Sequence, residues 1–239
     1  MKPATDPLFP PKDLKEAKEI QLRLKRKIKL IPFGKKPKFI EGVDAAFCGE
    51  YVIAAACLYK YPELVPVEDA YAVTKISFPY ITGYLSFREG PAIIKAVKKL
   101  KTKPDLVLFD GQGIAHPKGI GIASHIGALL DIPSIGCAKS RLIGDYKGPG
   151  MQKGQYALLK YKTKTVGAVL RTRNDIRPLF VSPGHLTTLK DAMYYVLRCT
   201  GKFRIPEPIR RADYISKSYK SEGPRSIEAV PFPYPKFPS

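Results

Sequence analysis

Apolar side chains recur at helical spacing in four segments of the chain and a first-turn proline marks a fifth, which together predict five helices. The first lies in a very basic N-terminal segment, where a mostly apolar stripe is formed by Leu14, Ala17, Gln21, Leu24 and Ile28. We expect a second helix to begin at Gly90-Pro91, because a proline in the first turn loses no helical hydrogen bond. The other three are predicted by Ile122, Ile126 and Leu129, by Leu189, Met193 and Val196 behind a capping signal at Thr188 and Asp191, and by a first-turn proline at Pro208.

Shorter runs of β-branched, aromatic and other apolar residues lie between these helices and predict strands. They cover residues 39–47, 51–59, 70–78, 105–109, 134–138, 155–161, 166–171 and 179–181. Short connections favour an antiparallel meander of the first three strands, and residues 105–138 are expected to form a right-handed β-α-β unit. This order of elements predicts an α/β fold, in which a mixed sheet is flanked by helices in a single domain.

Composition divides the chain into three parts. Residues 1–38 are expected to form a basic helix and a linker that pack on the domain, and residues 39–220 to form the α/β domain itself. Residues 221–239 are dense in proline and aromatic residues. Such a segment supports neither helix nor sheet, so we expect an extended or disordered tail.

The charge balance adds a partner to this picture. The chain has 41 lysines and arginines against 21 aspartates and glutamates, which gives a formal charge of +20. This surplus favours a polyanion, and nucleic acid first of all, because each phosphate contact releases condensed counterions. The alternative is a lysine-rich surface that keeps the protein soluble. The lysine face of the first helix likewise either lies on a phosphate backbone or faces water.

Location and redox state are predicted by what the sequence lacks. No stretch approaches the roughly 18 apolar residues of a membrane span, and the charged N-terminus lacks the apolar core of a signal peptide. We therefore expect a cytoplasmic protein with no membrane partner, and a monomer. Four cysteines without C-x-x-C or metal-finger spacing are expected to be small buried apolar side chains: Cys48, Cys57, Cys137 and Cys199.

Two aspartates lie where a strand makes a charge costly. Asp44 interrupts an apolar run, and Asp110 ends the apolar run at residues 106–109 and precedes Gly111. A carboxylate beside a sheet core needs a counter-charge, and in open α/β sheets ligands bind at the carboxyl ends of the strands. A hard divalent cation is a natural partner for such a pair. Taken singly, Asp44 could equally be a strand-edge carboxylate and Asp110 a turn residue.

Three further features have both a chemical and a structural interpretation. Glu89 lies just before the predicted helix start, where the helix dipole favours a carboxylate whatever its function. The glycines of the loop at residues 110–119 let backbone N–H groups approach a ligand beside His116. Tyr80 and Tyr84 either pack in the core or stack on bases.

Longer motifs resemble those of the endonuclease V family. Residues 79–89 read Pro-Tyr-Ile-Thr-Gly-Tyr-Leu-Ser-Phe-Arg-Glu, which resembles the family's Pro-Tyr-x-x-Gly-x-Leu-x-Phe-Arg-Glu motif. Residues 110–139 resemble its block of Asp-Gly-x-Gly, His-Pro, Ala-Ser-His and Gly-x-Ala-Lys. Gly184-His185 and residues 206–213 match two further motifs, so the resemblance extends from about residue 42 to residue 216 in the family's order.

The resemblance implies a ribonuclease H-like fold and a catalytic group within residues 39–220. In this group Asp44, Asp110 and Glu89 bind the metal, Asp213 takes a fourth acidic position, and Lys139 contacts the phosphate near the cut. Some family members carry histidine at the position of Asp213. The alternative for Asp213 is a helix-surface acid that pairs with a lysine four residues further on.

Two recognition elements are implied in the same way. A wedge that holds the nucleic-acid strands apart matches Pro79, Tyr80, Ile81, Thr82 and Gly83. Many bacterial relatives have proline where this chain has Thr82, so a looser turn is expected. The pocket for an extruded hypoxanthine is expected to be lined by Gly83, Gly111, Gln112, Gly113, Ile114, His116, Gly121, Ala138 and Leu142.

By this resemblance the chain is a Mg²⁺-dependent endonuclease of DNA repair, in which Mn²⁺ substitutes for Mg²⁺. Its substrate is damaged DNA that contains deoxyinosine, cut at the second phosphodiester bond on the 3′ side of the lesion to leave a 3′-hydroxyl and a 5′-phosphate. One alternative is an endoribonuclease for inosine in RNA, because a single contact to a 2′-hydroxyl can decide between the two sugars. The others are a non-catalytic nucleic-acid-binding module and an enzyme for a small phosphorylated substrate.

Overall fold

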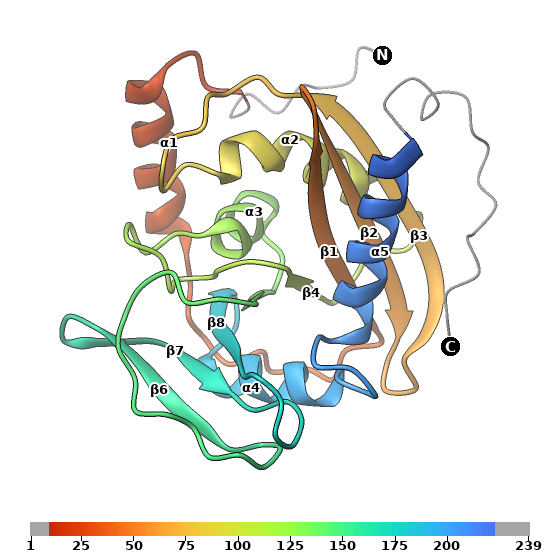
Figure 1. Ribbon diagram of the computed structural model, residues 1–239. Coiled ribbons are helices and arrows are strands. Elements are labelled where there is room, and N and C mark those ends of the chain that lie inside the picture. The colour runs from red at the N-terminus through yellow and green to blue at the C-terminus, as the bar shows by residue number, and fades with distance from the viewer. Residues whose placement is uncertain (1–9, 223–239) are drawn as a thin grey trace.

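The computed structural model describes residues 10–222, in which helices cover both faces of one eight-stranded mixed sheet (Figure 1). The five predicted helices are present as α1 (Leu14–Lys27), α2 (Ser86–Lys99), α3 (Ile122–Leu130), α4 (Leu189–Arg198) and α5 (Glu207–Glu222). The strands are β1 (Phe39–Cys48), β2 (Tyr51–Lys60), β3 (Val65–Lys75), β4 (Leu106–Phe109), β5 (Ser134–Ala138), β6 (Tyr156–Tyr161), β7 (Lys164–Leu170) and β8 (Leu179–His185). The predicted α/β class, with a mixed sheet flanked by helices in one domain, is confirmed. The predicted tail lies almost wholly outside the described residues.

The strand order β3-β2-β1-β4-β5-β8-β7-β6 places two parallel pairs, β1 with β4 and β4 with β5, in the middle of the sheet. The meander β1-β2-β3 is antiparallel, as predicted, and β6 and β7 form a further antiparallel hairpin. Val43 of β1 lies beside Phe109 of β4, and the Asp110 backbone N–H donates to the Val43 carbonyl at 2.9 Å. The register therefore places Asp44 and Asp110 next to each other.

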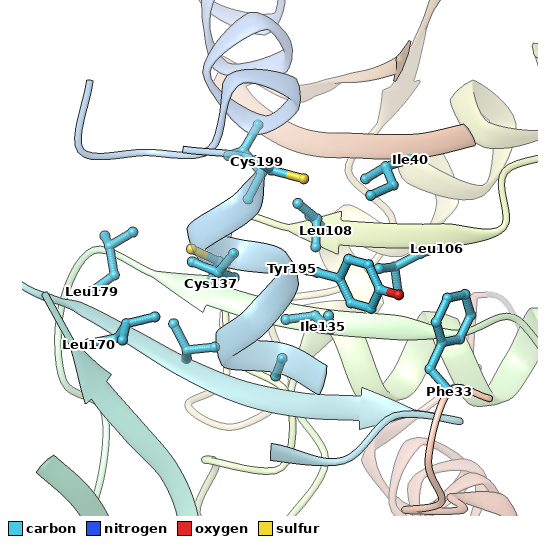
Figure 2. Packing of buried hydrophobic residues seen from close by; sticks show 14 of the residues in the cluster. Phe33, Ile40, Leu106, Leu108, Ile135, Cys137, Leu170, Leu179, Tyr195 and Cys199 are labelled. Atoms are coloured by element: carbon cyan, nitrogen blue, oxygen red, sulfur yellow. The ribbon is translucent and has the colours of Figure 1, made fainter. Parts of the chain in front are cut away.

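Strand β4 is buried on both faces, as its unbroken apolar sequence predicts. Leu106 and Leu108 point to the face covered by α4 and the start of α5, where they pack with Ile40 and Tyr195 (Figure 2). Val107 and Phe109 point to the opposite face and pack against α2 and α3. The carboxyl end of β4 thus emerges between two layers of helices.

Helix α1 packs outside this layer, against α3 and the segment that precedes α2 (Figure 1). Its apolar stripe is buried through Ala17, Ile20 and Leu24, which contact a cluster of Phe78, Tyr84, Phe87 and Ile120. The amphipathic helix predicted from the spacing is confirmed, although Leu14 at its first turn is exposed.

The predicted start of α2 at Gly90-Pro91 is wrong, because the helix begins at Ser86 and Pro91 lies inside it. An internal proline removes one helical hydrogen bond. Burial of the preceding turn offsets this loss, since Phe87 is fully buried among the aromatic side chains of Phe78 and Tyr84. Glu89 therefore lies in the first turn of the helix and not before it.

Strand β3 also differs from its prediction, because it runs over Val65–Lys75 and not over residues 70–78. Proline is disfavoured inside a strand because it lacks the N–H donor. Pro66 is nevertheless part of β3, because β3 is an edge strand, where a missing N–H is tolerated. Strand β8 continues beyond the predicted residue 181 to His185, through Pro183, which pairs with Ile135 of β5.

Two further expectations concern the cysteines and a membrane span. None of the four cysteines forms a disulfide, and Cys57, Cys137 and Cys199 are buried as predicted, whereas Cys48 is only partly buried. Among the described helices, none combines the length and the apolar character that a membrane crossing requires.

Candidate active site

Three aspartates converge at the carboxyl end of β4. Asp44 lies on β1, Asp110 directly follows β4, and Asp213 lies on α5. Each offers a carboxylate oxygen, and these three oxygens lie within 4.8 Å of one another. The register of β1 and β4 explains the first two, whereas the third depends on how closely α5 approaches the sheet.

Gly42 and a buried ion pair bring α5 onto β1. A Cβ at Gly42 would lie 2.1 Å from the backbone of Pro208, so glycine alone permits this approach. Further along the helix, Arg211 makes a bidentate contact to Asp69 of β3, with distances of 2.6 and 2.9 Å between guanidinium nitrogens and carboxylate oxygens. Both side chains are buried, which fixes the helix two residues before Asp213.

Basic and hydroxyl groups surround the three carboxylates. The Lys139 Nζ lies 2.5 Å from Asp110 Oδ2 and 2.7 Å from Asp213 Oδ1. Lys217 Nζ lies 2.7 Å from the other oxygen of Asp213. Asp213 therefore forms the predicted pair with the lysine four residues further on, Lys217. The same carboxylate also faces Asp44 and Asp110. Ser216 donates from Oγ to Asp44 Oδ2 at 3.1 Å.

The cluster has more negative charge than its surroundings neutralise. Burial, followed by the charges of Asp110 and Asp213, raises the pKa of Asp44 to about 7, against the opposing effect of Lys139. Burial would also raise the pKa of Asp213, but Lys139 and Lys217 hold it below its ordinary value. For Lys139, burial lowers the pKa while Asp110 and Asp213 raise it, with a net increase. Lys139 is therefore a firmly charged ammonium between two carboxylates.

Glu89 lies near this cluster but outside the group of three among the described residues. Burial raises the pKa of Glu89 to about 8, and the charges of Asp44 and Asp110 add to the increase while Arg88 opposes it. Its place in the first turn of α2 suits the helix dipole, and its electrostatic coupling to two aspartates suits an acidic site. A role of Glu89 as a metal ligand stays a prediction.

A cavity of about 420 Å³ opens beside the acidic cluster. Its wall is formed by Tyr80, Ile81, Thr82, Gly83, Leu85, Ser86, Glu89, Asp110, Gly111, Gln112, His116, Ile120, Gly121, Ile122, Ala138, Lys139, Ser140, Arg141 and Leu142. Asp110, Glu89 and Lys139 belong both to this wall and to the acidic site, so the cavity and the carboxylates form one continuous site.

Most predicted pocket residues line this cavity, but Gly113 and Ile114 do not. Gly113 donates its backbone N–H to Ser182 Oγ at 2.8 Å, and a Cβ there would lie 2.2 Å from the Pro183 carbonyl oxygen. The Ile114 N–H donates to the same carbonyl at 2.9 Å. These two residues therefore hold the glycine-rich loop (residues 110–119) against β8 behind the wall.

His116 contributes a neutral ring to the cavity wall. Burial lowers the pKa of His116 to about 4, and the charges of Lys118 and Lys25 add to the decrease. The Lys118 backbone N–H lies 3.3 Å from His116 Nδ1, which assigns Nδ1 as the acceptor. The other ring nitrogen then carries the proton and is a hydrogen-bond donor at neutral pH.

The wedge turn (residues 79–83) resolves the two interpretations of the tyrosines. Tyr80 is 71% exposed at the cavity mouth, with the guanidinium carbon of Arg88 5.8 Å from its ring centroid. Tyr84 is only 6% exposed and packs in the core. Tyr80 is thus available to stack on a base, whereas Tyr84 is structural. Pro79 is the one wedge residue that does not line the cavity.

Sequence reasoning missed several residues of the site. Ser216 contacts Asp44 from α5, and its spacing of three residues from Asp213 was the only signal for it. Ser140 and Arg141 line the cavity between two predicted residues, Lys139 and Leu142, so their position could have identified them. Leu85, Ser86, Ile120 and Ile122 carry no chemical signal in the sequence.

The donor set tests whether a metal ion fits this site. Three carboxylates offer only oxygen ligands, which hard divalent cations prefer. Burial first, and then the charges of Asp110 and Asp213, raise the pKa of Asp44, and a bound cation would oppose both effects. The residues therefore fit a metal-binding cluster of Asp44, Asp110 and Asp213.

A mixed sheet that gathers carboxylates beside a deep cavity, in a strongly basic chain, defines the class of nucleases that act on phosphodiester bonds. The family model of Endonuclease V matches residues 22–214. The chain therefore belongs to the endonuclease V family.

Individual relatives agree with this assignment over most of their length. Endonuclease V of Geotalea uraniireducens is 49% identical over 208 residues, which are 87% of this chain and 89% of that protein. The crystal structure of endonuclease V from Streptomyces avermitilis superposes with a TM-score of 0.85 at 38% identity, over 89% of this chain and 95% of that one. Endonuclease V of Ciona intestinalis, crystallised with a 23mer DNA containing an inosine followed by a ribo-adenosine, superposes with a TM-score of 0.77 at 28% identity, over 87% and 97%.

Proposed function

We propose that this chain is a DNA-repair endonuclease that cleaves DNA containing deoxyinosine at the second phosphodiester bond on the 3′ side of the lesion. The products are a 3′-hydroxyl and a 5′-phosphate. The observation that carries the proposal is the continuity of the cavity with the acidic cluster through Glu89, Asp110 and Lys139. A base held in the cavity places its own strand beside the carboxylates. The inosine-containing DNA bound to the Ciona relative supports the same substrate class.

Selection of the base is assigned to the cavity. Extrusion from the stack costs least for a weakly paired base, which favours deoxyinosine over normal nucleotides. The neutral His116 ring is a donor suited to a carbonyl at position 6 and unsuited to the amino group of adenine. Exclusion of the additional 2-amino group of guanine is assigned to the cavity wall. Such unpaired polar groups typically cost about 1–3 kcal/mol each.

Cleavage is assigned to the acidic cluster. Mg²⁺ held by Asp44 and Asp110, or Mn²⁺ in its place, would supply activation of water and stabilisation of charge on the phosphate. Asp213 and Glu89 complete the acidic environment, and Ser216 holds the Asp44 carboxylate in place. Lys139, an ammonium at the boundary between cluster and cavity, contacts the phosphate at the cut.

Denaturing-gel cleavage tests the proposal. Matched DNA duplexes with and without one deoxyinosine are incubated with Mg²⁺, Mn²⁺ or EDTA. We expect a nick one nucleotide beyond deoxyinosine that requires either metal and is absent from the normal duplex. A metal-independent nick, or no cut at the lesion, would contradict the proposed reaction.

An RNA strand with one inosine belongs in the same assay. The ribo-adenosine that follows inosine in the Ciona complex makes inosine-containing RNA the second candidate substrate. Faster cleavage of RNA than of DNA would keep the site assignments and replace the DNA-repair role by one in RNA metabolism.

A further inference from the structure

Helix α1 reaches the wedge turn through one buried hydrogen bond. Gln21 of α1 is only 3% exposed, and its Nε2 donates to the carbonyl oxygen of Gly83 at 2.8 Å. The two residues are 62 positions apart in the sequence. Gly83 closes the wedge turn and lines the cavity, so α1 is tied directly to the recognition elements.

Gly83 is a position where the backbone needs external support. Its φ of +81° lies in the left-handed region, which favours glycine and carries a wide choice of conformations in a mobile chain. The turn around it is closed by the Tyr84 backbone N–H, which donates to the Ile81 carbonyl at 3.0 Å. A hydrogen bond from Gln21 fixes the orientation of the Gly83 peptide and thereby of the exposed Tyr80 and Thr82 that precede it.

The apolar contacts of α1 act on the same turn from both ends. Ile20 and Leu24 pack in one cluster with Phe78, just before the wedge turn, and with Tyr84, just after it. These contacts hold α1 in place independently of Gln21. Loss of the Gln21 amide therefore affects the turn without releasing the helix.

Lys25 of α1 lies near the part of the cavity wall that contains His116. Its charge is among the causes that lower the pKa of His116. The Lys25 ammonium also lies near Gly119 at the end of the glycine-rich loop, within 3.2 Å of the position that a Cβ on that glycine would take. One face of α1 thus borders both recognition elements.

We infer that Gln21 is a positioning residue, which acts from α1 through Gly83 to hold the wedge turn and the adjoining wall of the base cavity. Gln21 lies just outside residues 22–214, which the family model matches. The inference rests on the proposed function for its effect on catalysis, but the contact itself can be tested without any substrate.

Hydrogen–deuterium exchange of the free protein tests the contact. Gln21→Met keeps a side chain of similar length and removes the donor. We expect amide exchange of residues 79–85 to become about tenfold faster, which corresponds to the loss of one net hydrogen bond. Exchange of α2 and α3 is expected to stay unchanged. Leu22→Met is the matched control, because it introduces the same side chain one position away, on the exposed face of α1, and keeps the Gln21 amide.

Cleavage of two substrates tests the consequence. Strand separation is needed in a duplex and not in a single strand, so we expect Gln21→Met to lower the ratio of duplex to single-strand cleavage of deoxyinosine about tenfold. The Leu22→Met control is expected to keep the wild-type ratio. Gln21→Glu, which keeps the shape and loses the donor when ionised, replaces the methionine variant if that variant does not fold.

Wild-type exchange of residues 79–85 in Gln21→Met, or an unchanged ratio of duplex to single-strand cleavage, would overturn the inference. Faster exchange throughout the protein would also overturn it, since it would indicate a general structural role. If the wild-type chain cleaves no deoxyinosine at all, the proposed function fails, while the exchange experiment still decides whether Gln21 holds the turn.

Discussion

At the scale of single residues, strand β1 carries two acids whose surroundings differ. Asp44 shares its burial with two aspartates, a lysine and a hydroxyl donor, which together form a site. Glu41, three residues earlier, is fully buried, and neither of its carboxyl oxygens has a hydrogen-bond partner among the described residues. Polar groups thus converge on Asp44 and not, among the described residues, on Glu41.

Asp110→Asn tests the acidic cluster. The amide keeps the size of the side chain and removes the charge that a divalent cation needs, so cleavage of deoxyinosine DNA is expected to fall by at least roughly a hundredfold. Binding of the same DNA is expected to persist, because one repulsive charge is removed. Gel cleavage and fluorescence anisotropy measure the two effects.

Asp175→Asn is the control for this substitution, since Asp175 is exposed and has a φ of 58°, which asparagine tolerates. Cleavage by Asp110→Asn at the rate of this control would show that Asp110 holds no essential metal.

Glu41→Gln tests the effect of the buried acid on stability. Burial raises the pKa of Glu41 from its ordinary 4.5 to about 8 in the folded protein. Between these two values the folded state keeps a proton that the unfolded chain has lost, so stability falls as the pH rises. We expect Glu41→Gln to flatten this decline. From pH 5 to pH 8 its free energy of unfolding should rise by a few kcal/mol relative to that of the wild type.

Thermal or urea unfolding at a series of pH values measures this gain. Parallel stability curves for the wild type and Glu41→Gln would contradict a proton held by Glu41.

At the scale of elements, α5 decides whether the acidic cluster exists. It brings Asp213 and Ser216 to the two aspartates of the sheet, and it does so through the close contact of Pro208 with Gly42 and the buried pair of Arg211 with Asp69. Helix α1 plays the corresponding part for the wedge turn. Both helices are remote in sequence from the segments that they hold in place.

Arg211→Met tests the clamp on α5. It leaves Asp69 buried without its counter-charge, and breaking a buried pair in this way typically destabilises by about 3–5 kcal/mol. The double variant with Asp69→Leu removes both charges and is expected to recover most of that loss. Urea unfolding of the wild type, both single variants and the double variant gives the coupling energy, and additive effects of the two substitutions would exclude a buried clamp.

At the scale of the whole molecule, the formal charge of +20 is expected to strengthen the affinity for nucleic acid. The acidic cluster repels phosphate locally, so the attraction must come from the rest of the surface. Charge spread in this way supports binding along a strand and contributes little to base selection.

The salt dependence of binding measures this attraction. If the site neutralises about 6–10 phosphates, affinity for DNA is expected to fall by roughly 10³- to 10⁵-fold between about 50 and 200 mM salt. The same slope is expected for normal and deoxyinosine duplexes, because phosphate contacts carry no sequence information. A flat dependence would mean that the basic surface serves solubility and not binding.

Local pattern determined most of the fold. Hydrophobic periodicity located four of the five helices and the strands along the chain, because burial of one helix face or of both strand faces requires a repeating pattern within a few residues. The fifth helix was indicated by its first-turn proline. Local pattern failed at Pro66 and Pro91, where position at a sheet edge and aromatic packing overrode the local preference. Family motifs indicated Asp44, Asp110 and Asp213, but not how they meet.

Tertiary structure alone decided which residues share a site. Asp213 joined Asp44 and Asp110 because α5 crosses β1 at a glycine, and Gly113 and Ile114 moved behind the cavity wall because their backbone N–H groups bind β8. The contacts of Ser216 with Asp44 and of Gln21 with Gly83 join residues 172 and 62 positions apart, and no local pattern indicated either contact. Sequence spacing encodes neighbours along an element, whereas a hydrogen bond between distant elements depends on the packing of every element between them.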